Sequence, residues 1–424
     1  MTPEPAVSPT RRQLLGGLLA AGAVVSGSQF TDGADAPPSP VAAPGQVVDS
    51  PPVLQNPSST GVTVVWAVSA PSTGWVEYGA TADKLDRRAV APAFGLLPFS
   101  ERFISARLDG LEPGKTIHYR AVTRPVTFRG AYKIEPGEAV AGPVYTFTPP
   151  DPAAVRASFA VINDTHEQTP TLKELTAKLA ADPADFTIWN GDVFNDIRTD
   201  DQVVAQVLRP AGAAYAANRP VLFTSGNHDV RGVAARGLSR AISPWAEHGA
   251  LGRSFTVRHG PLAVVGLDTG EDKPDHHPAW GGLAAFEPYR VAQAAWLAAA
   301  LKRPEIASAP FVVVFCHIPL WGLPGDNPGD TLEGYASYCR HAQTLWHPAL
   351  AAANVQLLVC GHTHKHRYDA PAEGRPYGQL VGGGPKLDRA TLIRGVATGE
   401  KLTVTASDLA GKELGAWTFD ARKV

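Results

Sequence analysis

Alternation of apolar and polar positions dominates residues 51–149 and predicts β-strands. The runs GVTVVWAV and WVEYG alternate, and FSERFISARLDGLEPGKTIHYRAVT holds two more alternating runs around a Leu-x-Pro-Gly turn. Alternation places every second side chain on one face, which suits a sheet with one buried face. Helical spacing is hard to find here. We therefore expect an all-β sandwich over residues 51–149.

Residues 148–155, TPPDPAAV, break this pattern, and a different one begins beyond them. Strand-like apolar runs now alternate with helical spacing, as in TLKELTAKLAA, where Leu172, Leu175 and Leu179 would share one face. Three alternating runs, ATLIRGVA, KLTVTASD and LGAWTFD, come last. Strands that alternate with helices are typical of an α/β sheet, so we place an α/β domain at residues 156–424.

Polar residues accumulate where five apolar runs of this second part end. ASFAVIN leads into DTH, FTIWN into GD, RPVLFTS into GNHD, FVVVFC into a single histidine, and VQLLVC into GHTH. Ligands of α/β sheets gather beyond the carboxyl ends of the strands. We therefore expect the polar residues of these five motifs to lie close together.

The residue types in these motifs complement one another as metal ligands. Two carboxylates, one amide and four imidazoles suit first-row divalent metals, and they belong to Asp164, His166, Asp192, Asn227, His317, His362 and His364. Seven ligands are too many for one ion, but with one carboxylate shared they divide into two shells of four that leave room for water or substrate. A structural zinc site would be closed and often cysteine-rich, and no two cysteines here have that spacing.

Each motif alone is weak evidence, because a histidine after a strand is often a polar group that a backbone carbonyl satisfies. An α/β scaffold with accidental Asp and His at its strand ends would require five coincidences in chain order. Three further features are less specific. Arg231 is a candidate phosphate contact, His276 and His277 lie in a loop that either lines the substrate rim or is simply solvated, and the long segment after His317, with Trp321, is either a lid or a surface excursion.

The ordered set DTH, GD, GNHD, H and GHTH resembles the signature of the calcineurin-like metallophosphoesterases, from Ser158 to about Gly383. The resemblance implies a four-layer α/β/β/α sandwich. It also implies that Asp164, His166, Asp192 and His364 hold one metal ion, and that Asp192, as the bridge, holds a second with Asn227, His317 and His362. His228 would contact phosphate or protonate the leaving oxygen, and Asp229 would orient its ring.

A second resemblance concerns the β-sandwich. Leu111-Glu112-Pro113-Gly114 followed by Tyr119 resembles the E–F corner of fibronectin type III domains, where the tyrosine hydroxyl ties the strand to the turn. Such a domain ahead of a metallophosphoesterase is similar to the plant-type purple acid phosphatases. This chain departs from them twice, with His166 where they have glycine and Asn195 where they have the iron-binding tyrosine. We therefore expect a protein that is not purple, closer to the cyclic-nucleotide phosphodiesterase-like branch.

The N-terminal residues indicate export. Arg11 and Arg12 precede a Gly/Ala/Leu-rich run at residues 14–25 that is too short for a stable membrane anchor. This resembles a twin-arginine (Tat) signal over residues 1–36, followed by a Pro/Ala-rich linker at 37–50. The alternative is a chance arginine pair before an apolar core helix, but the stretch up to Ser50 offers such a helix nothing to pack against. We expect the Tat export machinery as a partner, no membrane span after processing, and a periplasmic, envelope or extracellular location.

The small net charge argues against two kinds of binding partner. The formal net charge is only −2 in 424 residues, so nothing indicates binding to nucleic acid or to an anionic membrane surface. Three cysteines cannot all pair within one chain, and we expect Cys316 and Cys360 to be buried thiols, with a bridge between them as the alternative.

The sequence thus predicts an exported hydrolase that acts on phosphate mono- or diesters by attack of a metal-activated hydroxide. Four imidazoles favour iron, manganese or zinc over magnesium as the two divalent ions. The alternative is a phosphate- or carbohydrate-binding envelope protein with a weakly active metal domain. The motifs leave the substrate open, because loops decide among phosphate esters that share the same two-metal chemistry.

Overall fold

The computed structural model of the chain describes residues 47–423 apart from 324 and 327–336. The predicted leader at 1–36, most of the predicted linker at 37–50 and much of the predicted lid after His317 lie outside the described residues. No helix within the described part of the chain is long and apolar enough to cross a membrane.

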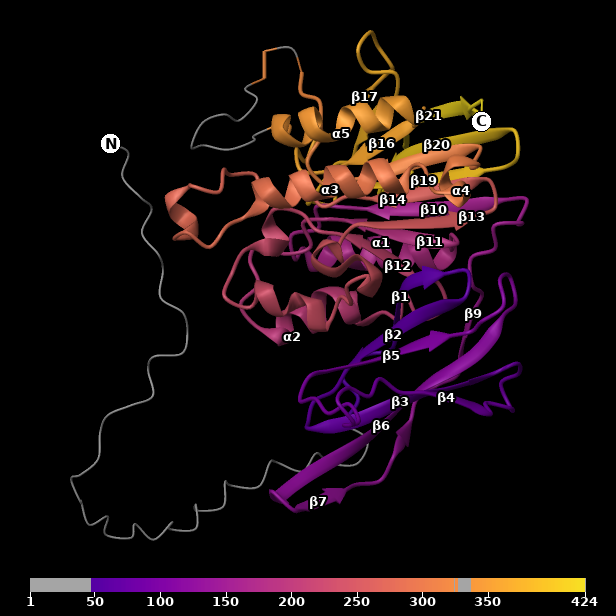
Figure 1. Ribbon diagram of the computed structural model, residues 1–424, viewed down its shortest axis with the longest axis vertical. Helices are drawn as coiled ribbons and strands as arrows, with labels where there is room; N and C mark the ends of the chain where they lie inside the picture. Colours follow the sequence, from indigo (N-terminus) through magenta and orange to yellow (C-terminus); the bar gives the residue numbers. More distant parts are fainter. Residues whose placement is uncertain (1–46, 324, 327–336, 424) are drawn as a thin grey trace, which may run out of the picture.

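Two β-sheets stack in the middle of the α/β part. The first runs in the order β21-β20-β19-β10-β11-β12-β1-β2-β5, from the top of the molecule in Figure 1 down to β5, below which β3, β6 and β7 are drawn. Its strands are β1 (Val53–Ser58), β2 (Gly61–Ala67), β5 (Phe103–Asp109), β10 (Ala157–Ile162), β11 (Phe186–Asn190), β12 (Val221–Thr224), β19 (Thr391–Ala397), β20 (Lys401–Asp408) and β21 (Glu413–Asp420). The second, in the order β13-β14-β15-β16-β18-β17, contains β13 (Phe255–His259), β14 (Leu262–Gly266), β15 (Phe311–Phe315), β16 (Leu357–Cys360), β17 (Arg367–Asp369) and β18 (Gly378–Val381).

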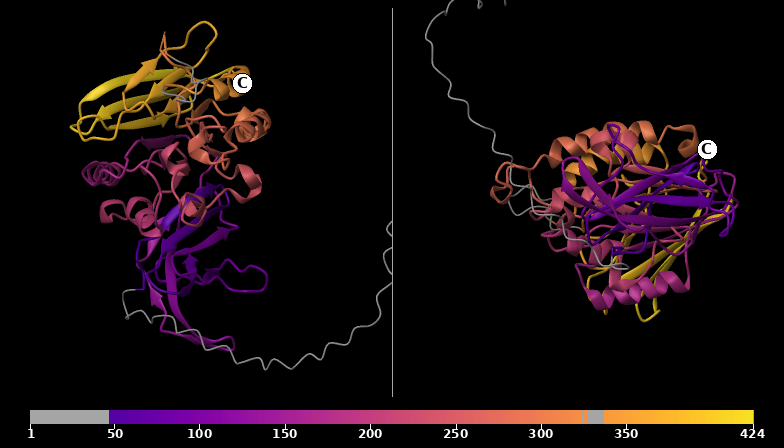
Figure 2. Two further views of the ribbon diagram at one scale, coloured as in Figure 1. Left: turned by 90° about the vertical axis from the view of Figure 1, so that its left-hand side faces the viewer. Right: turned by 90° about the horizontal axis from the view of Figure 1, so that it is seen from below.

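Helices cover the outer faces of both sheets. They are α1 (Thr169–Ala181), α2 (Asp200–Val203), α3 (Phe286–Ala300), α4 (Pro304–Ala307) and α5 (Arg340–Ala352). Leu172 and Leu175 of α1 pack on the first sheet, whereas Leu297 of α3 and Trp346 of α5 pack on the second. In Figure 2 these two groups of helices lie on opposite sides of the stacked sheets. The α/β/β/α sandwich expected for the metallophosphoesterase part is therefore confirmed.

The central strands are apolar throughout because both of their faces are buried. In β10, Phe159 and Val161 face the second sheet, whereas Ala160 and Ile162 face α1. Parallel strands covered on both sides lose the apolar/polar alternation of a half-exposed strand. This burial explains the continuous apolar runs that precede the five polar motifs.

Every regular element between residues 51 and 149 is a strand. A third sheet contains β3 (Ser72–Gly79), β4 (Arg87–Ala89), β6 (Ile117–Gly130), β7 (Lys133–Pro136), β8 (Val140–Ala141) and β9 (Tyr145–Phe147), with β6 paired to β3, β7, β8 and β9. It packs on β2 and β5 through an apolar layer that includes Trp66, Ile104 and Tyr119. The fibronectin type III likeness and the domain limits at 149 and 156 stay predictions.

The β-sandwich is continuous with the α/β part through the first sheet. Gln55 of β1 pairs with Val221 of β12 in parallel register. The Gln55 side chain extends the contact, because its amide donates to the Ala241 carbonyl at 2.9 Å and accepts from the Ser243 N–H at 2.8 Å. One sheet thus joins the two parts of the chain.

Tyr119 makes a different contact from the one expected of a tyrosine corner. Its hydroxyl is buried and donates to the carbonyl of Ala217 at 2.6 Å, in the α/β part, rather than to the turn at residues 111–114. The expected local tie is therefore wrong. The sequence could not show this, because the acceptor is a backbone carbonyl 98 positions away.

Candidate dinuclear metal centre

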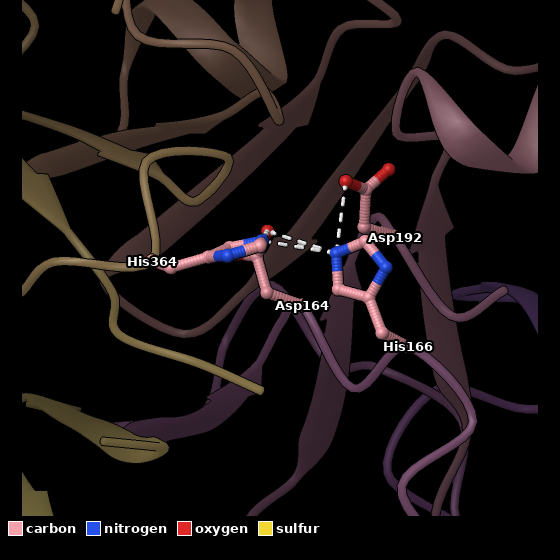
Figure 3. Close-up of side chains that lie close together, drawn as sticks. All are labelled: Asp164, His166, Asp192 and His364. Atoms are coloured by element: carbon pink, nitrogen blue, oxygen red, sulfur yellow. Dashed lines mark hydrogen bonds and ion pairs between the residues drawn. The ribbon is translucent and has the colours of Figure 1, made fainter. Parts of the chain in front are cut away.

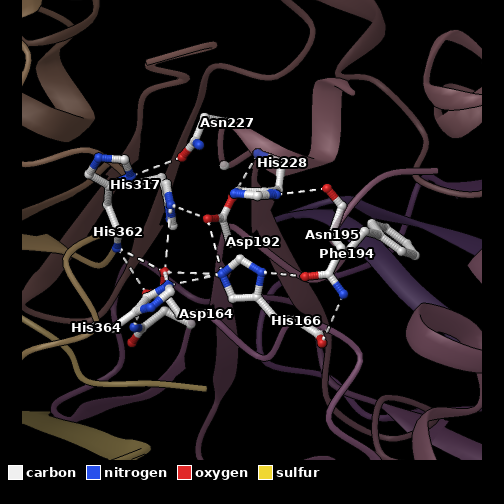
Figure 4. A network of polar contacts seen from close by, with 12 residues as sticks. Asp164, His166, Asp192, Phe194, Asn195, Asn227, His228, His317, His362 and His364 are labelled. Atoms are coloured by element: carbon white, nitrogen blue, oxygen red, sulfur yellow. Dashed lines mark hydrogen bonds and ion pairs between the residues drawn. The ribbon is translucent and has the colours of Figure 1, made fainter. Parts of the chain in front are cut away.

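The candidate site lies beyond the carboxyl ends of five strands from two sheets. Strands β10, β11 and β12 of the first sheet and β15 and β16 of the second each lead into one of the five motifs. Figure 4 shows side chains from all five loops pointing toward one another. All seven expected ligands meet there: Asp164, His166, Asp192, Asn227, His317, His362 and His364.

Four of these side chains form a first group, drawn in Figure 3. One ligand atom from each of Asp164, His166, Asp192 and His364 lies within 4.8 Å of the ligand atoms of the others. The Nε2 atom of His364 is 3.0 Å from His166 Nε2 and 3.3 Å from Asp164 Oδ1. Imidazole nitrogens and carboxylate oxygens that face one point are a donor set suited to a divalent cation.

A second group shares Asp192 with the first. The ligand atoms of Asp192, His317 and His362 also lie within 4.8 Å of one another. Asn227 joins this group, because its Oδ1 is 2.9 Å from His362 Nδ1. The Asp192 Oδ2 atom is 3.4 Å from His166 Nε2 and 3.1 Å from His317 Nε2, so one oxygen faces both groups.

One buried nitrogen among these ligands lacks a hydrogen-bond partner, and this supports a metal ion at the site. His317 is fully buried, and its Nδ1 lies 2.8 Å from the Asn190 carbonyl oxygen, so Nδ1 carries a proton and Nε2 is the nitrogen that could bind a metal ion. Its Nε2 is then left buried without a hydrogen bond, beside Asp192. A buried nitrogen is expensive to leave unsatisfied, and either a proton directed at Asp192 or a metal ion between His317 and Asp192 would satisfy it.

Backbone strain concentrates at the same residues. Five of the seven have positive φ angles: Asp164 (48°), His166 (42°), Asp192 (52°), His362 (72°) and His364 (57°). A non-glycine residue in the left-handed region costs about 1–3 kcal/mol and persists where the surrounding structure enforces it. Strain of this kind is common at binding and catalytic sites, and here it lets ligands two positions apart in one loop face the same point.

The carboxylates and imidazoles of the site shift one another's pKa values toward the charged forms. Burial by itself would lower the pKa of His317, but the carboxylates of Asp192 and Asp164 raise it to about 10. Burial would raise the pKa of Asp192, and the neighbouring His317 and His166 hold it well below its ordinary value instead. In the metal-free protein, Asp192 is therefore an anion that the His317 imidazolium compensates.

The ring of His228 is held by Asn195 rather than by Asp229. His228 Nδ1 lies 2.7 Å from the backbone oxygen of Asn195. The carboxylate of Asp229 instead accepts the backbone N–H groups of Asp192, Val193, Phe194 and Gly226. The expectation that Asp229 orients the His228 ring is thus wrong, because its oxygens are occupied in fixing the loops after β11 and β12.

Arg231 approaches the other side of the His228 ring. Its Nη1 lies 3.0 Å from His228 Nε2. Its Nε donates to Glu271 at 2.9 Å and its Nη2 to Asp272 at 2.9 Å, so two carboxylates fix the guanidinium. Burial lowers the pKa of His228, and the charge of Arg231 lowers it further against the opposing charge of Asp192. A neutral ring that accepts at Nε2 agrees with both contacts.

Three asparagines around the site were not anticipated as partners of the ligands. Asn163 donates to Gly383 at 3.0 Å, and Asn190 donates to Cys316 and Val359 at 3.1 Å each, which ties the two sheets together. Asn195 lies between His166 and His228. A sequence signal existed for Asn163 and Asn190, since each ends an apolar strand that is buried on both faces.

The remaining candidates lie outside the cluster. His277 accepts from the Ala279 N–H within its own turn. Cys316 and Cys360 are buried free thiols with their sulfur atoms 3.8 Å apart. Trp321 donates to the Tyr377 hydroxyl, and most of the segment that follows lies outside the described residues.

Comparison with known proteins agrees with this geometry. Residues 157–366 match the family model of the calcineurin-like phosphoesterases. No curated protein matches the chain by sequence. The fold resembles that of a purple acid phosphatase from yellow lupin (Lupinus luteus) seeds, with TM-score 0.63 and 14% identity over 87% of this chain and 74% of that one. It also resembles PhoD, with TM-score 0.55 and 13% identity over 86% of this chain and 91% of that one.

The matched region contains all five motifs, and the two solved structures extend the likeness in fold to the β-sandwich because they cover most of the chain. Residues 157–366 of this chain are therefore similar to the calcineurin-like phosphoesterases in sequence, and the side chains that could hold metal ions lie within this region.

Proposed function

We propose that the chain is an exported phosphoester hydrolase that works with two divalent metal ions, of iron, manganese or zinc. The observation that carries this proposal is the buried Asp192 carboxylate, whose Oδ2 atom faces imidazoles from both ligand groups. A metal-dependent phosphoesterase is the activity that the domain and the donor set support together.

The two ions would use the two groups of side chains. The first ion would be held by Asp164, His166, Asp192 and His364, and the second by Asp192, Asn227, His317 and His362. Bound in this way, two cations would activate a water molecule as the nucleophile and neutralise the phosphoryl oxygens. The protein itself would place the substrate and hold the groups that stabilise its charge.

Arg231 is positioned to bind the phosphoryl group beside the ions, and His228 is the neighbour that holds its Nη1 group there. His228 is adjacent to the ligand Asn227, and the Asn195 carbonyl fixes its ring so that Nε2 faces Arg231. The guanidinium is anchored on Glu271 and Asp272, which leaves Nη1 directed at His228. A phosphoryl oxygen bound there would accept a charge-assisted hydrogen bond from Arg231.

The substrate is a phosphate monoester or diester. The fold likeness to a purple acid phosphatase is compatible with either, but Asn195 stands where the purple enzymes have their iron-binding tyrosine. Its amide faces His166 at 3.3 Å, so this position serves a different purpose in this chain. We infer that the chain has no tyrosine-to-iron charge transfer.

Hydrolysis of bis(p-nitrophenyl) phosphate and p-nitrophenyl phosphate tests the proposed activity. Protein reconstituted with manganese, iron or zinc should hydrolyse at least one of them, and Asp192→Asn should reduce the rate to that of the metal-free protein. Asp420→Asn makes the same chemical change at an exposed position of β21 and should retain full activity. Absence of metal-dependent turnover with both compounds would favour the binding-protein alternative.

Proton release on metal binding tests the ligand role of His317. Its pKa of about 10 in the metal-free protein lies above the ordinary value, so the imidazolium and its ion pair persist at neutral pH and are lost as pH rises through 10. A metal needs the Nε2 lone pair, so binding must expel this proton and affinity should rise with pH. Calorimetry at pH 7 in buffers of different ionisation enthalpy should report at least about one proton released; tight binding without release would contradict the assignment.

Arg231 can be tested by a substitution that keeps the charge beside Glu271. Arg231→Lys should lower kcat/KM roughly 10- to 100-fold, because one charge-assisted hydrogen bond to the substrate is worth about 1.5–3 kcal/mol. Arg236→Gln, which removes a charge from an exposed side chain five positions further on, is the control and should leave kcat/KM unchanged. An unaltered kcat/KM in a folded Arg231→Lys protein would exclude the phosphate contact.

Export and the β-sandwich complete the proposal. The Arg11–Arg12 pattern supports passage through the Tat machinery to the periplasm, envelope or medium. The facing strand orders β1-β2-β5 and β4-β3-β6 support a fibronectin type III-like sandwich ahead of the catalytic domain. In cells that possess the Tat pathway, the full chain should fractionate outside the cytoplasm, and Arg11→Lys/Arg12→Lys should accumulate inside. Equal fractionation of the two proteins would exclude this route.

A further inference from the structure

The two ring nitrogens of His166 face different surroundings. Nε2 points into the first ligand group, 3.0 Å from His364 Nε2 and 3.4 Å from Asp192 Oδ2. Nδ1 points out of the group and lies 3.3 Å from the side-chain oxygen of Asn195, as Figure 4 shows. A neutral imidazole carries a proton on only one nitrogen, so the partner of Nδ1 decides whether Nε2 has a lone pair to offer.

Glu167 decides which end of the Asn195 amide faces His166. The Asn195 Nδ2 atom donates to Glu167 Oε2 at 2.8 Å. An ionised carboxylate only accepts hydrogen bonds, so the amide nitrogen must face Glu167 and the amide oxygen must face the ring. The oxygen in turn accepts only from a protonated Nδ1, so Nε2 is the nitrogen with the lone pair whenever the ring is neutral.

Glu167 is itself held in place. Gln202 donates to its other oxygen, and the Gln202 side chain is fixed by the Asp196 carbonyl at 2.7 Å and the Arg198 N–H at 2.9 Å. The loop after β10 is also tied to the loop after β11, because the His166 N–H donates to Asp192 at 3.0 Å and the Glu167 N–H donates to Val193 at 2.9 Å. The ring, the amide and the carboxylate therefore have one mutual arrangement.

We propose that Asn195 and Glu167 are positioning residues that hold His166 with Nδ1 protonated and Nε2 free to bind the first metal ion. This inference rests on the proposed function, because it concerns the same two-metal site. It also relates the two departures from the purple acid phosphatase pattern, since His166 and Asn195 are in contact with each other. Outer partners of metal-binding histidines commonly fix the tautomer in this way.

The first part of the test removes each partner and measures binding of zinc alone. Asn195→Leu and Glu167→Gln should each lower the affinity for one of the two zinc ions by about 10- to 100-fold. The affinity for the other ion should stay within a few-fold of that of the original protein, and titration calorimetry measures both. Glu174→Gln makes the same change at an exposed position of α1 and should bind both ions as the original protein does. Nitrogen NMR of the imidazoles should show His166 losing its single tautomer in the two affected variants.

The second part exchanges the two groups. Glu167→Gln/Asn195→Asp moves the carboxylate to position 195 and the amide to 167, so that the contact between them and an acceptor for His166 Nδ1–H are both retained. The double variant should bind zinc with an affinity within a few-fold of that of the original protein. It also serves as the folded reference if a single variant unfolds.

Three outcomes would overturn the inference. If the original protein binds two zinc ions and both single variants match it, Asn195 and Glu167 do not position His166, and the proposed function stands. If the single variants lose zinc but the folded exchanged pair does not regain it, the two residues act on packing rather than on the tautomer. If the original protein binds no zinc, manganese or iron, the proposed function falls as well.

Discussion

The buried carboxylate of Asp192 is the constraint on which the rest of the site depends. A charge that is almost completely removed from water must be compensated nearby, since isolated burial of a carboxylate is prohibitively expensive. Imidazoles from both sheets approach the Asp192 carboxylate, and its Oδ1 accepts the His228 backbone N–H at 2.9 Å. The metal-free arrangement relies on imidazolium charge, and the same geometry with cations in place would remove the need for it.

Tight loops bring the ligands to this carboxylate. The loops after β10 and β16 must turn sharply to present two side chains that are two positions apart, which agrees with the left-handed backbone at most of the ligands. Gly191 shows how little room is left, because it has φ 82° and a Cβ atom there would lie 2.5 Å from His317 Nδ1. The glycine of the GD motif is therefore required by the close approach of a ligand from the other sheet.

The outer contacts turn a cluster of polar residues into an ordered site. Asn190 fixes His317 through its backbone oxygen while its side chain ties the strands of the second sheet. Asn195 contacts His166 through its side chain and His228 through its backbone. The β-sandwich extends the same sheet that carries β10, β11 and β12, and Tyr119 donates to the Ala217 carbonyl, so the α/β part is also held from that side.

The sequence by itself determined the sandwich of strands, the α/β pattern and the seven residues that converge. It could do so because strand ends are marked by a change from apolar to polar residues, and because the chemistry of metal ligands restricts the residue types. Within residues 51–149, the alternation likewise predicted strands, and only strands are present there.

Only the tertiary structure decided which partners hold these residues. Asp229 was expected at the His228 ring, yet the ring is bound by the Asn195 carbonyl, and a backbone acceptor leaves no mark in a sequence. The anchors of Arg231, at Glu271 and Asp272, lie 40 and 41 positions away. The shared sheet and the Tyr119 contact are equally long-range. Local pattern fixes what a residue can do, whereas distant neighbours, brought close by packing, fix how it is oriented.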